Sequence, residues 1–528
     1  MTPSVPYQSI DQLISRHARE RGGKAYVISA ETGDQITYSQ LDAVTNRIGH
    51  FLASRGIRAN DRVSVLTDNC LSQVALFQGV QRYGATVNLV NCEVNAKNVE
   101  QILYDVEPNL VLWHRELAPE LQTIAKAQGV ENHSFGDLPE AGAGSEFFSL
   151  IASLPATRCE TIVGGPHDLA LINYTSGTTS KPKGVCCTHE CYFYDTDSVV
   201  AGFDIGENDR VLEYRALTWC SPQLLSMTAA LQAGASFVLA RKFSGSNFFD
   251  WIRKYGVTIS AGVPTAITML LERPHPVTKA DMPTLRYMTT STAPIAPETY
   301  EAFQKRYGIT LLQACGMSEA GFMFANDPKA PRRGPVGRPL RNLIARFVDE
   351  NGKDTPVGVE GELMVDGPHM FSGYLVGRGE IQPRPPGGFL SGDLGHFDED
   401  GYAFLTGRKK DLIIRGGVNI APTEISTILC EHPGVLEAAT IGVPDRIYGE
   451  AVACFVVPKP GHTLSTESVM EHLKPRLSEF KMPQSISFMK DLPKTDRAKV
   501  SKNHLLAYWK EHVQAQDTAT ATAEGVRR

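Results

Sequence analysis

The sequence predicts an α/β protein with three parts. A large N-terminal domain would have helices covering parallel sheets, followed by a small antiparallel β subdomain and an α+β C-terminal domain. Two observations support this: helical and strand-like apolar patterns alternate up to about residue 345, and short strands among glycines and prolines follow. With 528 residues, more than one core is expected. We place the N-terminal domain at residues 1–409, the C-terminal domain at 410–513 and a disordered polar tail at 514–528.

The elements of the first domain follow from apolar periodicity. After Thr37, apolar residues recur at helical spacing, so a helix is expected from about Ser39 until Gly56 closes it. A second helical pattern covers residues 71–80. Short continuous apolar runs, typical of buried strands, lie at 63–66, 85–90, 169–173, 236–240, 257–261, 285–290 and 310–313.

The later part of the chain has a different texture. Residues 360–365 and 401–405 are short strands, and residues 383–388 hold three prolines and then two glycines, which is typical of a connector. After residues 408–411 comes a compact stretch of roughly 100 residues with mixed helix and strand patterns. This stretch is the predicted C-terminal domain.

Composition excludes several classes of function. A net charge of −6 and a pI near 6.2 give no reason to expect binding to nucleic acid or to an anionic membrane. No apolar run has the length of a membrane span, and residues 1–6 lack the features of a signal peptide. The ten cysteines include Cys186, Cys187 and Cys191, but no second cluster has metal-ligand spacing. We therefore expect reduced thiols in a cytoplasmic protein, with a zinc site as the less favoured alternative.

Residues 174–184, YTSGTTSKPKG, form the stretch around which the chain is organised. Three Thr, two Ser, two Gly and a Pro leave no apolar stripe, so we expect a loop that follows the strand at 169–173. Such a loop offers backbone N–H groups, hydroxyls and two lysines to a polyanion such as a nucleotide triphosphate. It is not a Walker A loop, because Gly177 is followed after four residues by Pro-Lys-Gly.

This stretch resembles the phosphate-binding signature of the adenylate-forming superfamily, which includes acyl- and aryl-CoA synthetases. The resemblance extends from about Tyr38 to about Lys502 through four further stretches: STAP at 291–294, QACGMSE at 313–319, SGD at 391–393 with GR at 407–408, and LPKTDRAKV at 492–500. It implies that a small-molecule carboxylic acid reacts with ATP to give an acyl-adenylate and pyrophosphate. The acyl group then passes to an acceptor, most often CoA.

The resemblance also assigns roles to residues. Glu319 matches a Mg²⁺ ligand, as expected for a carboxylate beside a triphosphate, and Lys499 matches the catalytic lysine that stabilises charge during attack on the α-phosphate. Lys410 matches the family's hinge residue, at which the small domain swings after adenylation, so the resemblance implies a mobile α+β C-terminal domain. Gly416 and Gly417 match the face of that domain that turns toward the acceptor tunnel. The nucleotide contacts match Thr175, Ser176, Gly177, Thr178, Thr179 and Lys183 for the phosphates, Thr292, Ala293 and Pro294 for adenine, and Asp393 and Arg408 for ribose.

Three positions depart from the family pattern. Ser180 stands where the family usually has Gly, and Ala498 replaces the Gly that usually precedes the catalytic lysine. Cys315 stands where an aromatic side chain normally packs against the nucleotide. We expect the last change to alter the adenine or acyl pocket.

The region 213–221 matches the border of the acyl pocket. Trp219 lies near the position that gates the pantetheine tunnel of acyl-CoA synthetases, although a buried core tryptophan is the alternative. No Asp lies between residues 214 and 223, which disfavours an α-amino acid. Arg215 pairs either with a second anionic group of the substrate or with a structural partner. The other candidate lining residues are apolar and favour an aryl or short-to-medium acyl acid: Val263, Met317, Phe322 and Met323.

The resemblance leaves the acceptor open. Our first hypothesis is an AMP-forming acid–CoA ligase. The alternative keeps the adenylation step but transfers the acyl group to an amine, a carrier protein or another nucleophile.

Overall fold

The computed structural model describes residues 5–93, 95–138, 146–175, 183–293, 295, 297–494 and 500–514. Backbone contacts divide the chain into unit 1 (residues 1–293, 303–345 and 365–389) and unit 2 (residues 294–302, 346–364 and 390–528). The domain boundary between residues 409 and 410 stays a prediction. The predicted tail lies outside the described residues except for Gln514, which ends the short helix η5 (Lys510–Gln514).

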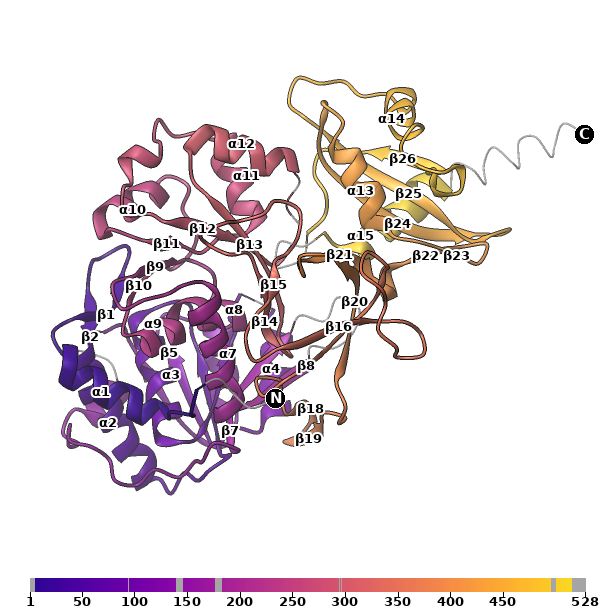
Figure 1. The fold of residues 1–528 in the computed structure, drawn as a ribbon. Helices are drawn as coiled ribbons and strands as arrows, with labels where there is room; N and C mark the ends of the chain where they lie inside the picture. Colours follow the sequence, from indigo (N-terminus) through magenta and orange to yellow (C-terminus); the bar gives the residue numbers. More distant parts are fainter. Residues whose placement is uncertain are drawn as a thin grey trace, which may run out of the picture. The chain divides into compact units, whose positions relative to one another are not determined.

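Unit 1 holds two large sheets with parallel bodies; the first has antiparallel strands at both edges and the second at one edge (Figure 1). The first has nine strands in the order β15-β14-β13-β12-β11-β9-β10-β1-β2, of which β1, β10, β9, β11, β12 and β13 pair in parallel. Their bounds are β1 Ala25–Ser29, β2 Gln35–Thr37, β9 Arg210–Glu213, β10 Ser236–Leu239, β11 Ile259–Ser260, β12 Tyr287–Thr290, β13 Leu311–Met317, β14 Gly321–Ala325 and β15 Arg338–Pro339.

The second sheet has eight strands in the order β19-β18-β8-β7-β4-β3-β5-β6. Strands β7, β4, β3, β5 and β6 are parallel, so their carboxyl ends share one edge, where ligands of such sheets usually bind. Their bounds are β3 Arg62–Leu66, β4 Thr86–Val90, β5 Leu110–His114, β6 Glu131–Phe135, β7 Leu169–Thr175, β8 Lys183–Thr188, β18 Gly373–Gly377 and β19 Glu380–Pro383.

Helices pack against these sheets, and local sequence sets their ends. Thr37 caps α2 in a capping box with Gln40, and Gly56 (φ 68°) follows its end, as the pattern predicted. Every residue of α3 is buried. The α-helices with residues in unit 1 are α1 Ile10–Arg21, α2 Tyr38–Ser54, α3 Leu71–Tyr83, α4 Ala96–Val106, α5 Pro119–Lys126, α6 Glu146–Ile151, α7 His189–Gly202, α8 Cys220–Pro222, α9 Ala229–Ala233, α10 Phe248–Tyr255, α11 Pro264–Glu272 and α12 Pro297–Tyr307.

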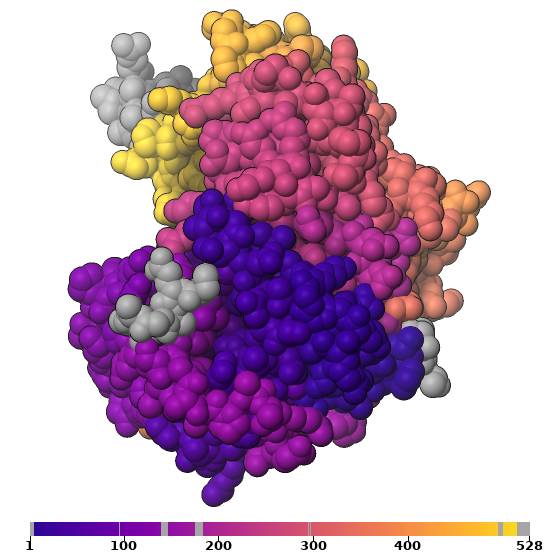
Figure 2. Space-filling model, turned by 90° about the vertical axis from the view of Figure 1, so that its left-hand side faces the viewer, coloured from indigo at the N-terminus to yellow at the C-terminus, as the bar shows by residue number. Residues whose placement is uncertain are grey.

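The N-terminal segment belongs to the first sheet although its partner strand lies some two hundred residues later. Strand β1 pairs in parallel with β10, matching Val27 with Phe237. Figure 2 shows this indigo segment side by side with the magenta part of unit 1. This long-range parallel pairing adds β1, and with it β2, to one edge of the nine-stranded sheet.

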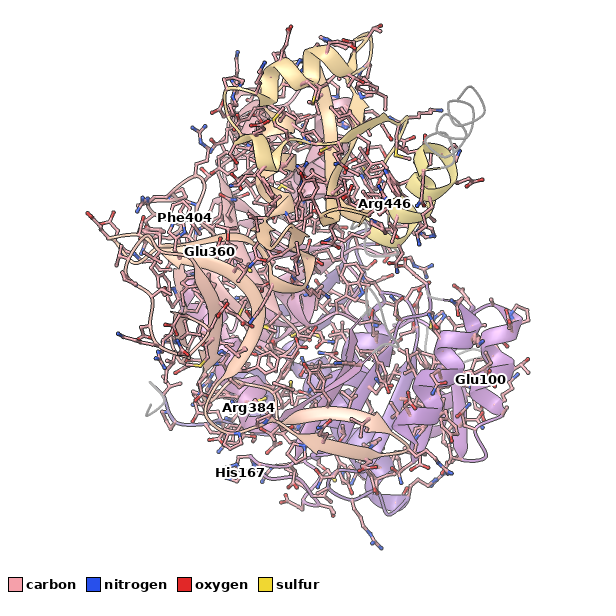
Figure 3. All side chains as sticks on the ribbon, turned by 90° about the vertical axis from the view of Figure 1, so that its right-hand side faces the viewer. Glu100, His167, Glu360, Arg384, Phe404 and Arg446 are labelled. Atoms are coloured by element: carbon pink, nitrogen blue, oxygen red, sulfur yellow. The ribbon has the colours of Figure 1, made fainter. Side chains whose placement is uncertain are left out.

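Unit 2 contains a four-stranded sheet of β16 (Ile344–Val348), β17 (Gly361–Asp366), β20 (Phe389–Phe397) and β21 (Ala403–Arg408), with a few strand ends assigned to unit 1. In Figure 3, Glu360 and Phe404 are labelled on this sheet. Phe404 stacks on His396, and Thr406 donates a hydrogen bond to Glu360. These strands confirm the antiparallel part of the predicted fold.

The rest of unit 2 is a five-stranded sheet with helices on both faces. Alternate residues of β25 point to opposite sides: Val452, Cys454 and Val456 pack with α13 and α14, whereas Ala453 and Phe455 pack with α15. The elements are β22 Ile413–Arg415, β23 Val418–Ile420, β24 Val435–Asp445, β25 Gly449–Pro458, β26 Ser485–Phe488, α13 Pro422–Cys430, α14 Thr466–Leu473 and α15 Lys502–Trp509. This confirms the predicted α+β C-terminal part.

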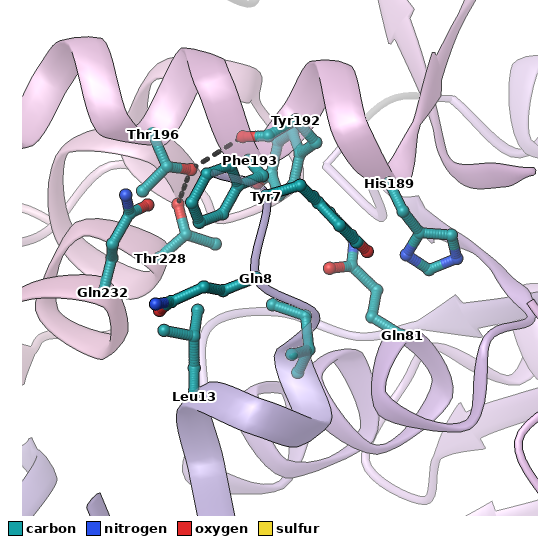
Figure 4. A pocket seen from close by; sticks show the side chains of 11 residues that line it. Tyr7, Gln8, Leu13, Gln81, His189, Tyr192, Phe193, Thr196, Thr228 and Gln232 are labelled. Atoms are coloured by element: carbon teal, nitrogen blue, oxygen red, sulfur yellow. Dashed lines mark hydrogen bonds between the residues drawn. The ribbon is translucent and has the colours of Figure 1, made fainter. Parts of the chain in front are cut away.

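Two further observations concern membrane-spanning helices and internal cavities among the described residues. None of their helices combines the length and the hydropathy needed to cross a membrane. A cavity of about 20 Å³ lies between the chain before α1 and helix α7, with Thr196 bonded to the Tyr192 carbonyl and to Thr228 (Figure 4). This volume suits one water molecule, so the cavity is too small for a substrate.

Candidate active site

The two ends of the predicted phosphate stretch belong to paired antiparallel strands of unit 1, which we call the phosphate hairpin. Tyr174 and Thr175 end β7, Lys183 and Gly184 begin β8, and Thr175 pairs with Lys183. Our prediction of a loop throughout 174–184 was therefore wrong at both ends, because backbone pairing outweighed the polar composition. Ser176, Gly177, Thr178 and Thr179 lie outside the described residues.

Gly184 lets the neighbouring strand approach this hairpin closely. A Cβ at this position would lie 2.9 Å from the Leu375 Cβ of β18. Strand β18 pairs antiparallel with β8, matching Gly184 with Leu375 and Val185 with Tyr374. The pairing brings the Tyr374 side chain to the base of the hairpin.

Tyr374 connects two predicted site residues. Its hydroxyl donates a 2.7 Å hydrogen bond to Glu319 Oε1, and the Lys183 ammonium lies over its ring, 5.0 Å from the centroid. Burial, with the Glu319 carboxylate as a second cause, raises the pKa of Tyr374, so the phenol stays protonated and keeps donating. The structure thus gathers Lys183 and Glu319 around one ring.

Glu319 lies in the tight turn between β13 and β14, and two glycines make this turn possible. A Cβ on Gly316 would lie 2.2 Å from the Gly321 carbonyl oxygen, and Gly321 has a φ of 55°. The Asp195 carboxyl packs against Gly321, where burial raises its pKa well above the ordinary value. Strand β13 also runs to Met317, beyond the predicted end at 313, because β14 pairs with it.

The predicted adenine segment follows β12, as expected for a ligand site of a parallel sheet. Thr292 adopts a φ of 78°, which is rare for a β-branched residue and marks strain of the kind found at ligand sites. Thr292 and Ala293 are exposed, and Pro294 lies outside the described residues.

The predicted border of the acyl pocket runs from the end of β9 through turns into a short helix. Trp219 precedes the one-turn helix α8 and is half-buried, and a π-helix, η1 (Gln223–Thr228), follows. Buried Gln223 donates a 2.7 Å bond to the Leu217 carbonyl and accepts one from Asn173 on β7. Gln223 therefore anchors the Trp219 segment to the strand that leads into the phosphate hairpin.

The apolar candidates separate into two groups. Val263 precedes α11 and Met317 ends β13, and both are half-buried. By contrast, Phe322 packs edge-to-face on Phe203, and Met323 has no exposed surface. Phe322 and Met323 therefore fill the core.

Arg215 is a structural residue. It is 4% exposed and forms a double ion pair with Glu213, at 2.9 Å from Nε to Oε1 and 2.7 Å from Nη2 to Oε2. Glu213 is fully buried and also accepts from Ser226 Oγ and two backbone N–H groups. Of the two alternatives for Arg215, the structure favours the salt bridge.

In unit 2, the predicted ribose contacts face each other across two strands. Asp393 on β20 pairs with Arg408 on β21, and Arg408 Nε lies 2.8 Å from Asp393 Oδ1. The Asp393 side chain is 9% exposed, whereas that of Arg408 is 46% exposed. The ion pair orients the carboxylate.

Lys410 is exposed and lies in the 3₁₀ turn η3 (Lys409–Asp411), between two anchored neighbours. Lys409 Nζ is 2.8 Å from Glu362 on β17, and Asp411 is 3.0 Å from Lys502 at the start of α15. Lys409 is therefore tied to strand β17, and Asp411 is tied to helix α15. A torsional change at Lys410 would act between them.

Gly416 and Gly417 form the two-residue turn between β22 and β23. Their φ values of 57° and 84° match a type I′ turn, which requires positive φ at both positions. Exposed apolar side chains surround this part of unit 2: Ile414, Val418, Ile447, Tyr448 and Phe480. An exposed cluster of this kind is typical of a contact surface.

Lys499 lies outside the described residues, but the described residues on either side of 495–499 make defined contacts. Lys494 and Val500 form an isolated antiparallel bridge, and Ser501 donates a 2.7 Å bond to the Pro493 carbonyl. Lys494 also lies 3.1 Å from Glu437. This bridge therefore joins the two described residues that flank residues 495–499.

Two protein-family models match this chain, one over its N-terminal part and one near its C-terminal end. The model described as AMP-binding enzyme matches residues 14–375, more than half of the chain, and the model described as AMP-binding enzyme C-terminal domain matches residues 424–499. This chain belongs to the AMP-binding enzymes. The second match ends at Lys499, the predicted catalytic residue.

Full-length relatives support this assignment. The sulfoacetate–CoA ligase of Cupriavidus necator is 31% identical over 508 residues, covering 95% of this AMP-binding enzyme and 98% of the relative. The oxalate–CoA ligase of Arabidopsis thaliana is 30% identical over 485 residues, covering 90% and 94%. ATP-bound MatB from Rhodopseudomonas palustris matches with a TM-score of 0.86 and 30% identity, covering 95% and 99%. The predicted fold and the class of AMP-forming acid–CoA ligase are confirmed.

Sequence reasoning missed two residues of this AMP-binding enzyme that organise the site. Tyr374 lies in an ordinary short strand, and its link to Glu319 arises only from the pairing of β18 with β8. Gln223 lies in an apolar stretch, where a lone Gln was the only available signal. Both act through contacts between segments far apart in the chain.

Proposed function

We propose that this AMP-binding enzyme activates an aryl or short-to-medium acyl acid with Mg²⁺ and ATP and transfers the acyl group to CoA. The observation that carries the proposal is the cluster of Lys183, Tyr374 and Glu319 at the base of the phosphate hairpin. Its cation and carboxylate suit a triphosphate and its metal ion, respectively.

Glu319 fits the metal role by its hydrogen bonding. Tyr374 occupies Oε1, and within the described part of the chain no donor reaches Oε2. A hard divalent cation prefers such carboxylate oxygens and shares them with phosphates. Mg²⁺ held there would neutralise phosphate charge, while Lys183 would bind a phosphate oxygen directly.

The proposed substrate class is supported by residues 213–221, in which the two charged side chains, Glu213 and Arg215, pair with each other. Glu213 neutralises Arg215, and the candidate lining side chains Trp219, Val263 and Met317 are apolar or aromatic. An acid with an uncharged second group would therefore bind better than a dianion. The ten free cysteines of the chain support a cytoplasmic location.

A panel of carboxylic acids, assayed for pyrophosphate release with and without CoA, tests this function. We expect release with aryl or short acyl acids, and thioester formation only when CoA is present. Oxalate and a sulfonated acid serve as dianionic comparators. A preference for the dianions would overturn the substrate class, and pyrophosphate release without any thioester would overturn the acceptor.

Lys410→Pro is expected to separate the two half-reactions. Proline fixes φ, so a swing that needs this torsion would be blocked after adenylation. We expect near-normal pyrophosphate release in a single turnover and strongly impaired acyl transfer. Lys410→Ala, which leaves the torsion free, is the control. A proline variant with both steps intact would show that the hinge lies elsewhere.

Trp219→Ala tests the proposed acceptor tunnel. If the half-buried ring closes the tunnel, its removal changes CoA-dependent product formation, while acid-dependent pyrophosphate release stays within a few-fold. If the ring is instead part of the core, truncation costs about 3–5 kcal/mol of stability and damages both steps alike. Thermal unfolding measured beside the two assays distinguishes these outcomes.

A further inference from the structure

Three side chains with metal-binding chemistry meet at one edge of the eight-stranded sheet. Cys70 follows β3, His114 ends β5 and Asp137 follows β6, and these three parallel strands are neighbours in the order β3-β5-β6. The phosphate hairpin follows β7 at the same edge, on the other side of β4. The cluster therefore occupies its own part of the sheet edge and contains none of the adenylation candidates.

The ligand atoms are already close. One atom each from Cys70, His114 and Asp137 lies within 4.8 Å of the other two, and His114 Nε2 is 3.5 Å from Asp137 Oδ1. His114 is only 6% exposed, and its Nε2 and the Asp137 Oδ1 are buried without a well-formed hydrogen bond. A buried imidazole nitrogen and carboxylate oxygen with poor partners are suited to a shared cation.

We propose that Cys70, His114 and Asp137 bind a zinc ion. Thiolate, imidazole and carboxylate are the ligand types that Zn²⁺ combines, usually in a tetrahedron. Zinc–ligand bonds of about 2.0–2.3 Å place tetrahedral ligand atoms about 3.3–3.7 Å apart, so the largest separation in the cluster has to shorten by at most about 1.5 Å. Three protein ligands leave a fourth position for water or another donor.

The surroundings hold two of the three ligands in place, and one contact of the third ligand would have to change. Arg241 donates a 2.8 Å bond to Asp137 Oδ2, which fixes the carboxylate and leaves Oδ1 for the metal. Cys70 caps α3, since its sulfur accepts from the Gln73 N–H at 3.4 Å, which fixes the position of the sulfur. Zinc at Nε2 would place the imidazole proton on Nδ1, so the 3.3 Å contact from the Glu116 N–H would have to lengthen.

The competing interpretation is a cluster held by hydrogen bonds alone. In the metal-free state the Cys70 thiol and the His114 ring both face Asp137, which also binds Arg241. A metal would replace the first two of these contacts with stronger bonds and connect three strand ends. The proposal does not depend on the adenylation mechanism, because binding can be measured without substrate.

The test uses full-length protein stripped with a chelator and then dialysed against Zn²⁺ or Co²⁺ alone. We expect about one equivalent of bound metal, a higher unfolding temperature with Zn²⁺, and a thiolate-to-Co²⁺ charge-transfer band in the ultraviolet. Cys70→Ser, which retains a capping oxygen, and His114→Asn should both lose stoichiometric uptake. Cys92→Ser, which removes the half-buried thiol after the neighbouring β4, should retain it.

Each outcome decides the proposal. The charge-transfer band of the unsubstituted protein reports the site even if a variant fails to fold, and its loss in Cys70→Ser but not in Cys92→Ser assigns the sulfur. Absence of the band and of the zinc-induced rise would show a cluster held by hydrogen bonds only. Equal uptake by all variants would show adventitious metal, which would also overturn the site.

Discussion

Lys499→Ala is expected to lower kcat and kcat/KM for adenylate formation together, by about a hundredfold to a thousandfold. The reason is that its ammonium would act on charge that develops only as the carboxylate attacks the α-phosphate. The second half-reaction, started from preformed acyl-adenylate and CoA, should survive. Pyrophosphate release and thioester formation, measured separately, check both statements.

Lys494→Ala is the matched control for this variant. Lys494 belongs to the same bridged loop, but its ammonium is 3.1 Å from Glu437. We expect its loss to leave adenylation within a few-fold. Equal damage by the two substitutions would mean that the loop, and not the Lys499 charge, is what adenylation requires. Equal damage to both half-reactions in Lys499→Ala would contradict its assigned role.

Glu213→Ala is expected to lower the free energy of unfolding by about 3–5 kcal/mol, because it leaves the Arg215 guanidinium buried without its counter-ion. Both side chains are essentially excluded from solvent, and Glu213 also holds Ser226 at the π-helix. Replacing both charged residues by methionine should cost less than Glu213→Ala alone. Denaturant unfolding followed by intrinsic fluorescence measures the difference.

Glu207→Ala provides the comparison for a surface pair. Glu207 binds Arg21 while its side chain is 58% exposed, so its loss should change stability far less than Glu213→Ala does. If Glu213→Ala is equally mild and instead changes the KM for dianionic acids, Arg215 would be a substrate residue after all. The structural assignment of the pair would then fail.

The sequence predicted the fold well because local patterns report burial and backbone geometry. Alternating apolar periods gave α2, β3, α3 and β4 in their order, and the strand after residue 285 correctly placed the Thr292 segment at a strand end. The helix capped at Thr37 also ends before Gly56, as its pattern predicted. Such features depend on residues adjacent in the chain, so they can be read without knowing the tertiary structure.

The tertiary structure alone decided which distant side chains meet. Polar composition predicted a loop at 174–184, but pairing of β7 with β8 makes its ends strands, and pairing of β8 with β18 adds Tyr374 to Lys183 and Glu319. Only the tertiary structure shows that the Glu213 side chain at the end of β9 is buried and forms an ion pair with Arg215. Cys70, His114 and Asp137 have no metal-ligand spacing in the sequence, because the order of β3, β5 and β6 brings them together. Strand order depends on packing across the whole sheet, which short-range sequence patterns do not specify.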